Sequence, residues 1–169
     1  MKIVLLDRDG TIIQDPEDER VDRTEKITLF PDSIEALRYF ADHDSEIIII
    51  TNQAGIAEGR INDAEFWDIH NEVLKQLSPS KAKFLKTYMN GEGSDPDVSE
   101  WRKPGPKMLL QAAEDFNLDL RDIYMVGDNQ SDIQAGINAG CKGGILVQTA
   151  RNKVVQSPNA VHTATNLLD

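Results

Sequence analysis

The sequence has little of several features that mark particular classes of protein. It contains one cysteine, Cys141, which excludes an internal disulfide framework. The apolar run in the opening "MKIVLLDRDG" is far too short for a signal peptide or a membrane span. The three histidines show no metal-ligand spacing. We therefore expect a cytoplasmic protein with no membrane partner.

Positive charge is also scarce. The chain has 18 Lys and Arg residues against 29 Asp and Glu residues, which gives a net charge of −11. Nonspecific nucleic-acid binding depends on neutralisation of phosphates by basic side chains, so nucleic acid is not a favoured partner. A small anionic ligand is not excluded, because local cations can reverse the potential inside a pocket.

The pattern of apolar residues predicts the fold. Short β-branched runs such as "KIVLL" and "EIIIITN" indicate buried strands, and "NDAEFWDIHNEVLKQL" has helical spacing behind an Asn62 capping box. Further helices are expected in "PDSIEALRYFADH", "GPKMLLQAAEDFNL" and "SDIQAGINAG", and further strands in "AKFLKTYM", "DIYMVGDN" and "GGILVQT". This alternation predicts an α/β fold, a Rossmann-like three-layer α/β/α sandwich with a mainly parallel sheet.

The length of 169 residues favours one domain spanning residues 1–169. Residues 10–26 carry no regular pattern and predict a functional flap or a small hairpin. The weakly patterned tail after Arg151 predicts a loop and a short edge element.

Polar residues gather where the predicted strands end. They follow the first, second and fourth strands and precede the helix at Pro106: Asp7, Asp9, Thr51, Asn52, Arg102, Lys103, Asp128, Asn129 and Asp132. Each stretch alone has an ordinary role as a cap, a strand end or a turn. Ligands of open parallel sheets bind beyond the carboxyl ends of the strands, so the coincidence of four such stretches predicts one site.

Such a set of side chains suits phosphoryl transfer. Asp7 and Asp128 would repel each other unless a cation lay between them, and hard oxygen ligands suit Mg²⁺. An ionised Asp7 can then attack phosphorus. Asp9, expected on the same side as Asp7, is positioned as general acid and later as base. Thr51 can hold phosphoryl oxygens, and Lys103 can offset the charge that develops.

These stretches resemble the motifs of the haloacid dehalogenase superfamily of aspartate-nucleophile phosphatases. "DRDGT" matches its first motif, "IIIITN" the second, "RKPGP" the third and "VGDNQSD" the fourth, in the expected order. The spacing of the first two motifs leaves no room for a large cap domain. The chain therefore resembles the capless branch, subfamily III, of histidinol-phosphate phosphatase and D-glycero-D-manno-heptose 1,7-bisphosphate phosphatase. Arg8, between the two aspartates, is typical of that branch.

The resemblance implies a Mg²⁺-dependent phosphomonoesterase that acts on a small phosphorylated metabolite through an aspartyl-phosphate intermediate. It makes Asp7 the nucleophile and Asp9 the general acid and base. The implied metal ligands are Asp7, the carbonyl of Asp9, and Asp128. The implied phosphate and substrate residues are Thr51, Asn52, Arg102 and Lys103. Asp132 would orient Lys103, and Asn129 would support the site.

The chain departs from this branch at the loop before the third motif. Relatives commonly bind structural zinc there through Cys and His residues. The aligned positions here are Tyr88, Asn90, Ser99 and Trp101, none of which is a thiolate or imidazole ligand, so no structural zinc is expected. We predict that Tyr88 and Trp101 pack against the domain and that Asn90, Ser94 or Ser99 hydrogen-bonds the turn. This predicted substrate loop covers about residues 90–103.

Other functions stay open. A polynucleotide 3′-phosphatase shares the first motif and a segment like "TNQAGI", although the charge disfavours it. A non-catalytic binding protein of this fold would not need the intact set of acids and Lys103. The acidic residues of the substrate loop favour an amine-bearing substrate such as histidinol phosphate: Glu92, Asp95, Asp97 and Glu100. The sequence does not indicate the oligomeric state.

Overall fold

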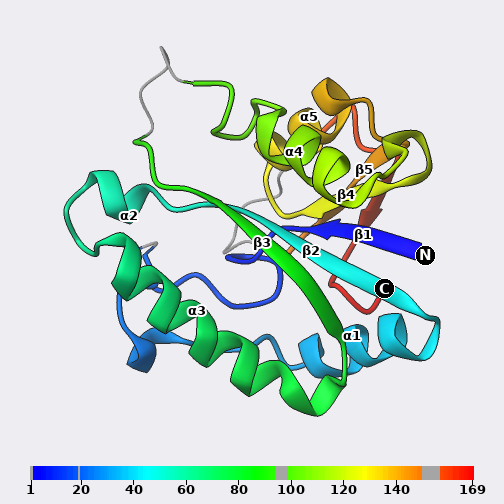
Figure 1. Ribbon diagram of the computed structural model, residues 1–169. Helices are drawn as coiled ribbons and strands as arrows, with labels where there is room; N and C mark the ends of the chain where they lie inside the picture. Colours follow the sequence, from blue (N-terminus) through cyan, green and yellow to red (C-terminus); the bar gives the residue numbers. More distant parts are fainter. Residues whose placement is uncertain (1, 19, 94–98, 150–156) are drawn as a thin grey trace.

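A six-stranded parallel sheet runs through the centre of the molecule (Figure 1). The computed structural model describes residues 2–18, 20–93, 99–149 and 157–169. The strands are β1 (Lys2–Leu6), β2 (Ser45–Asn52), β3 (Lys83–Asn90), β4 (Tyr124–Gly127), β5 (Gly143–Val147) and β6 (His162–Ala164). They pair in the order β3-β2-β1-β4-β5-β6, and every pair is parallel. The predicted Rossmann-like sheet is confirmed.

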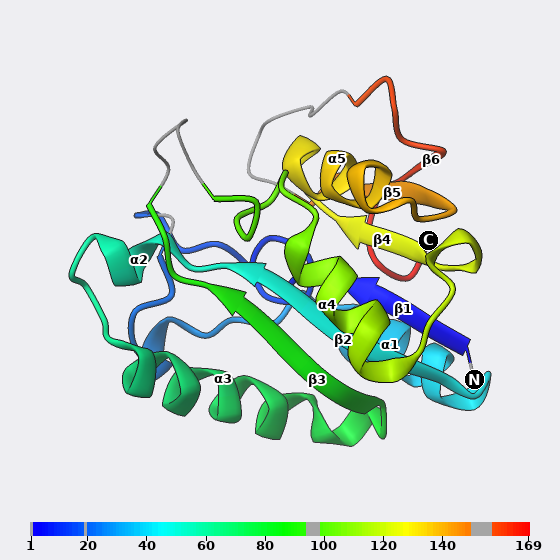
Figure 2. The same ribbon diagram turned by 45° about the horizontal axis from the view of Figure 1, so that its top comes forward.

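Helices cover both faces of the sheet (Figure 2). They are α1 (Ser33–Asp42), α2 (Ala54–Ala57), α3 (Asp63–Leu77), α4 (Lys107–Phe116) and α5 (Gln130–Ala139). Helices α1 and α3 pack in one apolar cluster with the sheet, and α4 and α5 pack in the other. Among the described helices, none is long and apolar enough to span a membrane.

The isoleucine run of β2 shows why the sheet lies between two apolar layers. Ile47 and Ile49 point into the α1 and α3 side, and Ile48 and Ile50 point into the α4 and α5 side. All four are fully buried. Burying one such side chain contributes about 1.5–3 kcal/mol relative to leaving it exposed, so a continuous apolar run is stable in a central strand.

Side-chain caps fix where two helices begin. In α3, Asn62 Oδ1 accepts from Glu65 N at 3.0 Å, and Glu65 Oε2 accepts from Asn62 N at 2.8 Å, which confirms the predicted capping box. In α5, Asn129 and Asp132 form a second capping box. This second cap places Asp132 in the first turn of α5, beside the carboxyl edge of the sheet.

Residues 10–26 form neither strands nor a regular helix among those described. Ile13 makes isolated bridges with Asp9 and Leu29, and a 3₁₀ turn covers Thr24–Lys26. Ion pairs hold the segment: Lys26 pairs with Asp18 at 2.6 Å, and Arg20 pairs with Glu58, just after α2, at 2.6 Å. The described residues of this segment form no regular hairpin, and its role as a flap stays a prediction. The short α2 was not predicted. The short edge element expected in the tail is β6.

Candidate active site

The predicted site residues meet at the carboxyl edge of the sheet. Asp7 directly follows β1, and Asp128 directly follows β4, the neighbouring strand. Thr51 lies near the end of β2, on the other side of β1. The strand order reverses between β1 and β4, and such a switch point is where open α/β sheets bind their ligands.

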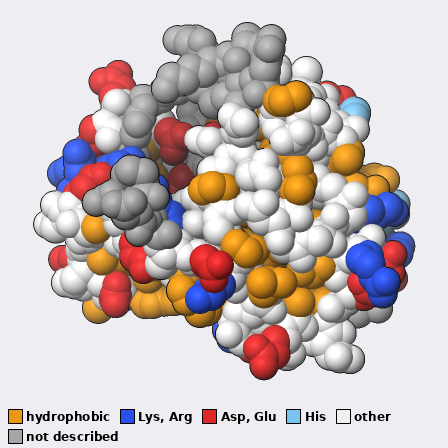
Figure 3. Space-filling model, turned by 90° about the horizontal axis from the view of Figure 1, so that it is seen from above, with side chains coloured by type: hydrophobic (Ala, Val, Ile, Leu, Met, Phe, Trp, Pro, Cys, Tyr) orange, Lys and Arg blue, Asp and Glu red, His pale blue; other side chains and the backbone are white. Residues whose placement is uncertain are grey.

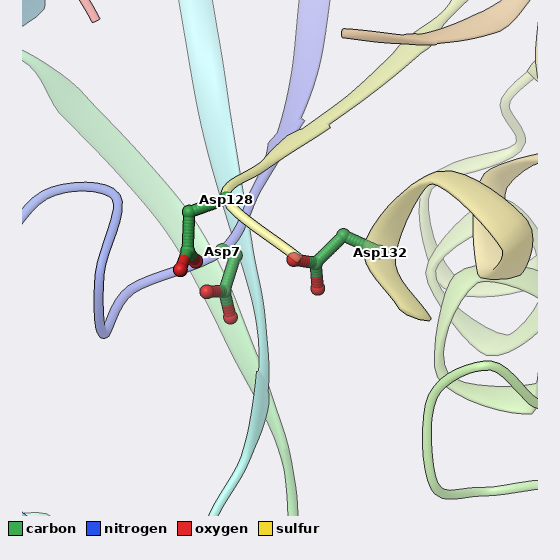
Figure 4. Close-up of side chains that lie close together, drawn as sticks. All are labelled: Asp7, Asp128 and Asp132. Carbon is green, nitrogen blue, oxygen red and sulfur yellow. The ribbon is translucent and has the colours of Figure 1, made fainter. Parts of the chain in front are cut away.

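Three buried carboxylates form a cluster at this point: Asp7, Asp128 and Asp132. One oxygen from each lies within 4.8 Å of the others, and the side chains turn toward one another (Figure 4). Two glycines make room for them. A Cβ at Gly10 would lie 2.4 Å from Asp128 Oδ2, and a Cβ at Gly127 would lie 2.3 Å from Asp132 Oδ2. The glycines of "DRDG" and "VGD" are therefore required by the packing of the acids.

The ammonium of Lys103 lies inside this carboxylate cluster. Its Nζ donates to Asp7 Oδ1 at 2.6 Å and to Ile50 O at 2.7 Å, and it contacts Asp132 Oδ1 at 2.6 Å. Burial opposes the charge on Lys103, but Asp132 and Asp7 outweigh burial and raise its pKa above the ordinary value. Lys103 is therefore a fully hydrogen-bonded buried cation.

One ammonium does not balance three carboxylates. Burial raises the pKa of Asp7 well above its ordinary value in spite of Lys103. Burial, with Asp132 and Asp15 nearby, raises the pKa of Asp128 to about 7. Acidic side chains are visible in a hollow of the face seen in Figure 3. Mg²⁺ prefers oxygen ligands such as carboxylates, and this cluster has more carboxylates than positive charges. Asp7, Asp128 and Asp132 therefore fit that ion.

Asp9 lies beside the carboxylate cluster and faces different partners. Arg8 Nη2 pairs with Asp9 Oδ2 at 2.9 Å, and Gln53 Nε2 donates to the same oxygen at 2.6 Å. Thr51 Oγ1 is 3.5 Å from it. The third carboxylate of the cluster comes from Asp132, which was predicted to orient Lys103 and to contact a metal-bound water. Asp9 was expected to contribute its backbone carbonyl to a metal.

Asn52, a predicted phosphate ligand, and Asn129, a predicted supporting residue, both have hydrogen-bond partners within the protein. Asn52 was expected to grip phosphate, but its Nδ2 donates to Lys103 O and its Oδ1 accepts from Lys103 N, both at 3.1 Å. The amide therefore orients the backbone of Lys103. The side chain of Asn129 caps α5 by accepting from Ser131 N at 3.3 Å, while Asp132 Oδ2 accepts from Asn129 N at 3.0 Å.

Arg102 lies next to Lys103 but points along the substrate loop. Its Nη1 donates to Glu92 O at 2.9 Å. Burial lowers the pKa of Arg102, and the nearby charge of Arg20 lowers it further. The Arg20 guanidinium that has this effect is itself paired with Glu58 at 2.6 Å.

The substrate loop follows the prediction only in part. Tyr88 is buried and its hydroxyl donates to Asp115 at 2.6 Å, as expected for a packed side chain. Trp101 is 38% exposed, so the prediction that it packs against the domain is wrong. Asn90 Oδ1 accepts from Glu92 N at 3.1 Å, and Ser99 donates to the Glu92 carboxylate. These hydrogen bonds hold the turn around Glu92, and Ser94 lies outside the described residues.

Three residues were given no role in the site by the sequence analysis, although they lie inside the motif stretches. Arg8 and Gln53 bind Asp9. Thr11 Oγ1 donates to Asp128 Oδ1 at 3.2 Å. The motifs "DRDGT" and "TNQ" contain all three residues. A sequence motif alone, however, does not show which of its side chains bind the other side chains of the site.

Comparisons with known proteins agree with this geometry. The sequence profile of the HAD-hydrolase-like family matches residues 100–169. The D-glycero-alpha-D-manno-heptose-1,7-bisphosphate 7-phosphatase of Campylobacter jejuni is 35% identical over 154 residues, which cover 90% of this chain and 86% of that protein. The chain belongs to the HAD-like hydrolase family. The predicted family and the predicted class of enzyme, a phosphatase, are confirmed.

Two further relatives of this HAD-like hydrolase are informative. The crystal structure of the D,D-heptose 1,7-bisphosphate phosphatase from Bordetella bronchiseptica, complexed with magnesium and phosphate, superimposes with a TM-score of 0.90 and 30% identity over 99% of this chain and 94% of that one. The histidine biosynthesis bifunctional protein HisB of Spirosoma linguale is 33% identical over 92% of this chain. The chain spans 41% of the length of that bifunctional protein.

Proposed function

We propose that this HAD-like hydrolase is a Mg²⁺-dependent phosphomonoesterase that forms an aspartyl-phosphate on Asp7. The observation that supports this is the carboxylate cluster, in which three buried acids lie together and the ammonium of Lys103 pairs with two of them, Asp7 and Asp132. Asp7 and Asp128 would hold Mg²⁺, with Asp132 beside them. The ion would offset the charge of the phosphoryl oxygens and of Asp7, so that the two anions can approach.

The chain's own residues account for the two half-reactions. A carboxylate oxygen of Asp7 attacks phosphorus, the bond from phosphorus to the leaving oxygen breaks, and Asp9 gives that oxygen a proton. Asp9 then takes a proton from water, whose oxygen attacks the same phosphorus. The bond from phosphorus to Asp7 breaks, and inorganic phosphate leaves. The Thr51 hydroxyl holds a phosphoryl oxygen, and Lys103 offsets developing charge.

We further propose a phosphorylated sugar of the heptose bisphosphate type as substrate. The names of the relatives from C. jejuni and B. bronchiseptica support this class. The amine hypothesis has less support, because Glu92 accepts from Ser99 and Glu100 pairs with Lys107 at 3.2 Å. Asp95 and Asp97 lie outside the described residues.

The activity is tested by hydrolysis of p-nitrophenyl phosphate with Mg²⁺ and with EDTA. We expect Mg²⁺-dependent turnover by wild type and only background hydrolysis by Asp7→Asn. The matched control is Asp68→Asn, because Asp68 is an exposed acid of α3 and should tolerate the same change of charge. Equal rates for wild type and Asp7→Asn would contradict the proposed mechanism.

The substrate is tested separately by comparing kcat/KM for heptose 1,7-bisphosphate, histidinol phosphate and a 3′-phosphorylated oligonucleotide. We expect the bisphosphate to be preferred. A preference for histidinol phosphate would favour the amine hypothesis, and a preference for the oligonucleotide would favour a polynucleotide phosphatase. Either result would overturn the substrate class and leave the phosphatase chemistry intact.

A further inference from the structure

A buried arginine grips the carboxylate that the proposed mechanism uses for proton transfer. Arg8 is 0% exposed, and its guanidinium lies 5.0 Å from the centre of the Phe66 ring on α3. Its Nε donates to Asp9 Oδ2 at 3.1 Å, and its Nη2 lies 3.0 Å from Oδ1 and 2.9 Å from Oδ2. This is a two-pronged, charge-assisted contact, which fixes the direction of a carboxylate as well as its position.

The surroundings of Arg8 do not explain why a cation occupies this place. Among the described residues, its Nη1 has no hydrogen-bond partner. A buried ion pair is often no more stabilising than apolar residues of the same volume, so an apolar side chain against Phe66 would serve packing at least as well. The one thing that the guanidinium supplies and an apolar group cannot is its hold on Asp9.

Gln53 holds Asp9 from a second direction. Its Nε2 donates to Asp9 Oδ2 at 2.6 Å and to Thr51 Oγ1 at 2.8 Å, and the residue is 8% exposed. Oδ2 of Asp9 therefore faces donors from both Arg8 and Gln53. Oδ1 faces Arg8 Nη2 alone among the described residues. Oδ1 therefore has fewer donors around it than Oδ2 and is the oxygen that a substrate can approach.

We propose that Arg8 is a positioning residue which, with Gln53, turns Oδ1 of Asp9 toward the leaving oxygen of the substrate. The inference rests on the proposed function, in which Asp9 is the general acid and base. In the first half-reaction the Oδ1–H bond of Asp9 breaks as an O–H bond forms on the leaving oxygen. In the second, the same oxygen receives a proton from water. Arg8 itself neither gives nor takes a proton.

This role predicts a dependence on the leaving group. An alkyl alcohol leaves only with a proton, whereas p-nitrophenolate leaves without one, so a misplaced acid slows alkyl phosphates selectively. The quantity to measure is kcat/KM, which covers the steps up to departure of the leaving group. The substrates are p-nitrophenyl phosphate and glycerol 2-phosphate, both with saturating Mg²⁺.

The variants are Arg8→Met, Arg8→Lys and Gln53→Leu, with Phe66→Leu as the control that removes the ring beneath Arg8 but keeps both holds on Asp9. General acid catalysis is worth roughly 10²–10⁴-fold, so we expect Arg8→Met to lower kcat/KM for glycerol 2-phosphate at least about tenfold more than for p-nitrophenyl phosphate. The ratio of kcat/KM for glycerol 2-phosphate to that for p-nitrophenyl phosphate should also fall in Gln53→Leu. It should fall less in Arg8→Lys than in Arg8→Met, and it should stay unchanged in Phe66→Leu.

Thermal melting accompanies each assay. If Arg8→Met does not fold, Gln53→Leu and Arg8→Lys still decide the question. Folded variants that slow both substrates by the same factor would show that Arg8 is only a packing residue, and would overturn the inference while the proposed function stands. A wild-type enzyme that hydrolyses neither substrate would overturn the proposed function itself.

Discussion

Replacing Asp128 by asparagine should stabilise the metal-free protein at alkaline pH. Burial, with Asp132 and Asp15, raises the pKa of Asp128 from 3.8 to about 7 in the folded protein. Because the folded pKa is above the unfolded one, stability is fully present below about pH 3.8 and is lost as pH rises through about 7. At about 1.4 kcal/mol per pKa unit, the ionised carboxylate costs on the order of 4 kcal/mol at pH 8.

Asparagine avoids this cost and keeps an oxygen that can accept from Thr11. In EDTA at pH 8, we therefore expect Asp128→Asn to raise the free energy of unfolding by up to about 4 kcal/mol, and by less than half of that at pH 5. Mg²⁺ should reduce this advantage of the variant. A ligand at 100 times its Kd adds about 2.7 kcal/mol to the protein that binds it, and the variant has lost one of the carboxylates that would bind the ion.

The assay is urea denaturation of wild type and Asp128→Asn at pH 5 and pH 8, each with EDTA or with Mg²⁺. Asp68→Asn serves as the control for removing an exposed acid. The reasoning would be refuted if Asp128→Asn were less stable than wild type in EDTA at pH 8. It would also be refuted if Mg²⁺ stabilised both proteins equally.

Three further results are expected. Asn52→Ala removes both hydrogen bonds to the Lys103 backbone, so urea denaturation should show a loss of about 1–3 kcal/mol, and kcat should fall more than KM rises. Gly127→Ala places a Cβ 2.3 Å from Asp132 Oδ2 and should abolish most activity, whereas Gly93→Ala, with 3.6 Å to its nearest neighbour, should not. Elemental analysis of the purified protein should find no stoichiometric zinc, and one zinc per chain would contradict the hydrogen-bonded loop.

The fold was predictable because local patterns and packing agree. The four consecutive isoleucines of β2 can all be buried only if apolar layers cover both faces of the sheet. The capping box of Asn62 and Glu65 likewise marks the start of α3. The positions of Asp7 and Asp128 followed from a general property of parallel sheets, since both residues directly follow strands. Predicting these two positions requires only knowing where each strand ends and that the strands are parallel.

The contacts that the sequence did not predict concern side chains whose partners come from distant segments. Asn52 carries an amide that can bind phosphate or backbone, and only the approach of the substrate loop decides between them. Asp132 was predicted to orient Lys103, and its Oδ1 does lie 2.6 Å from Lys103 Nζ, but its place in the carboxylate cluster depends on how α5 docks against β4. Trp101 was expected to pack against the domain in place of a metal site, but the burial of a side chain in a loop depends on what the loop covers.

The three contacts of the Lys103 ammonium have a consequence for its chemical reactivity. The amine is bound to Asp7, Asp132 and the carbonyl of Ile50, and Lys103 is 4% exposed. An amine-reactive reagent requires the free, uncharged base, which this site withholds while the carboxyl edge of the sheet stays closed. The rate at which Lys103 is acetylated by such a reagent would therefore follow the opening of that edge, and would turn one side chain into a reporter of local unfolding.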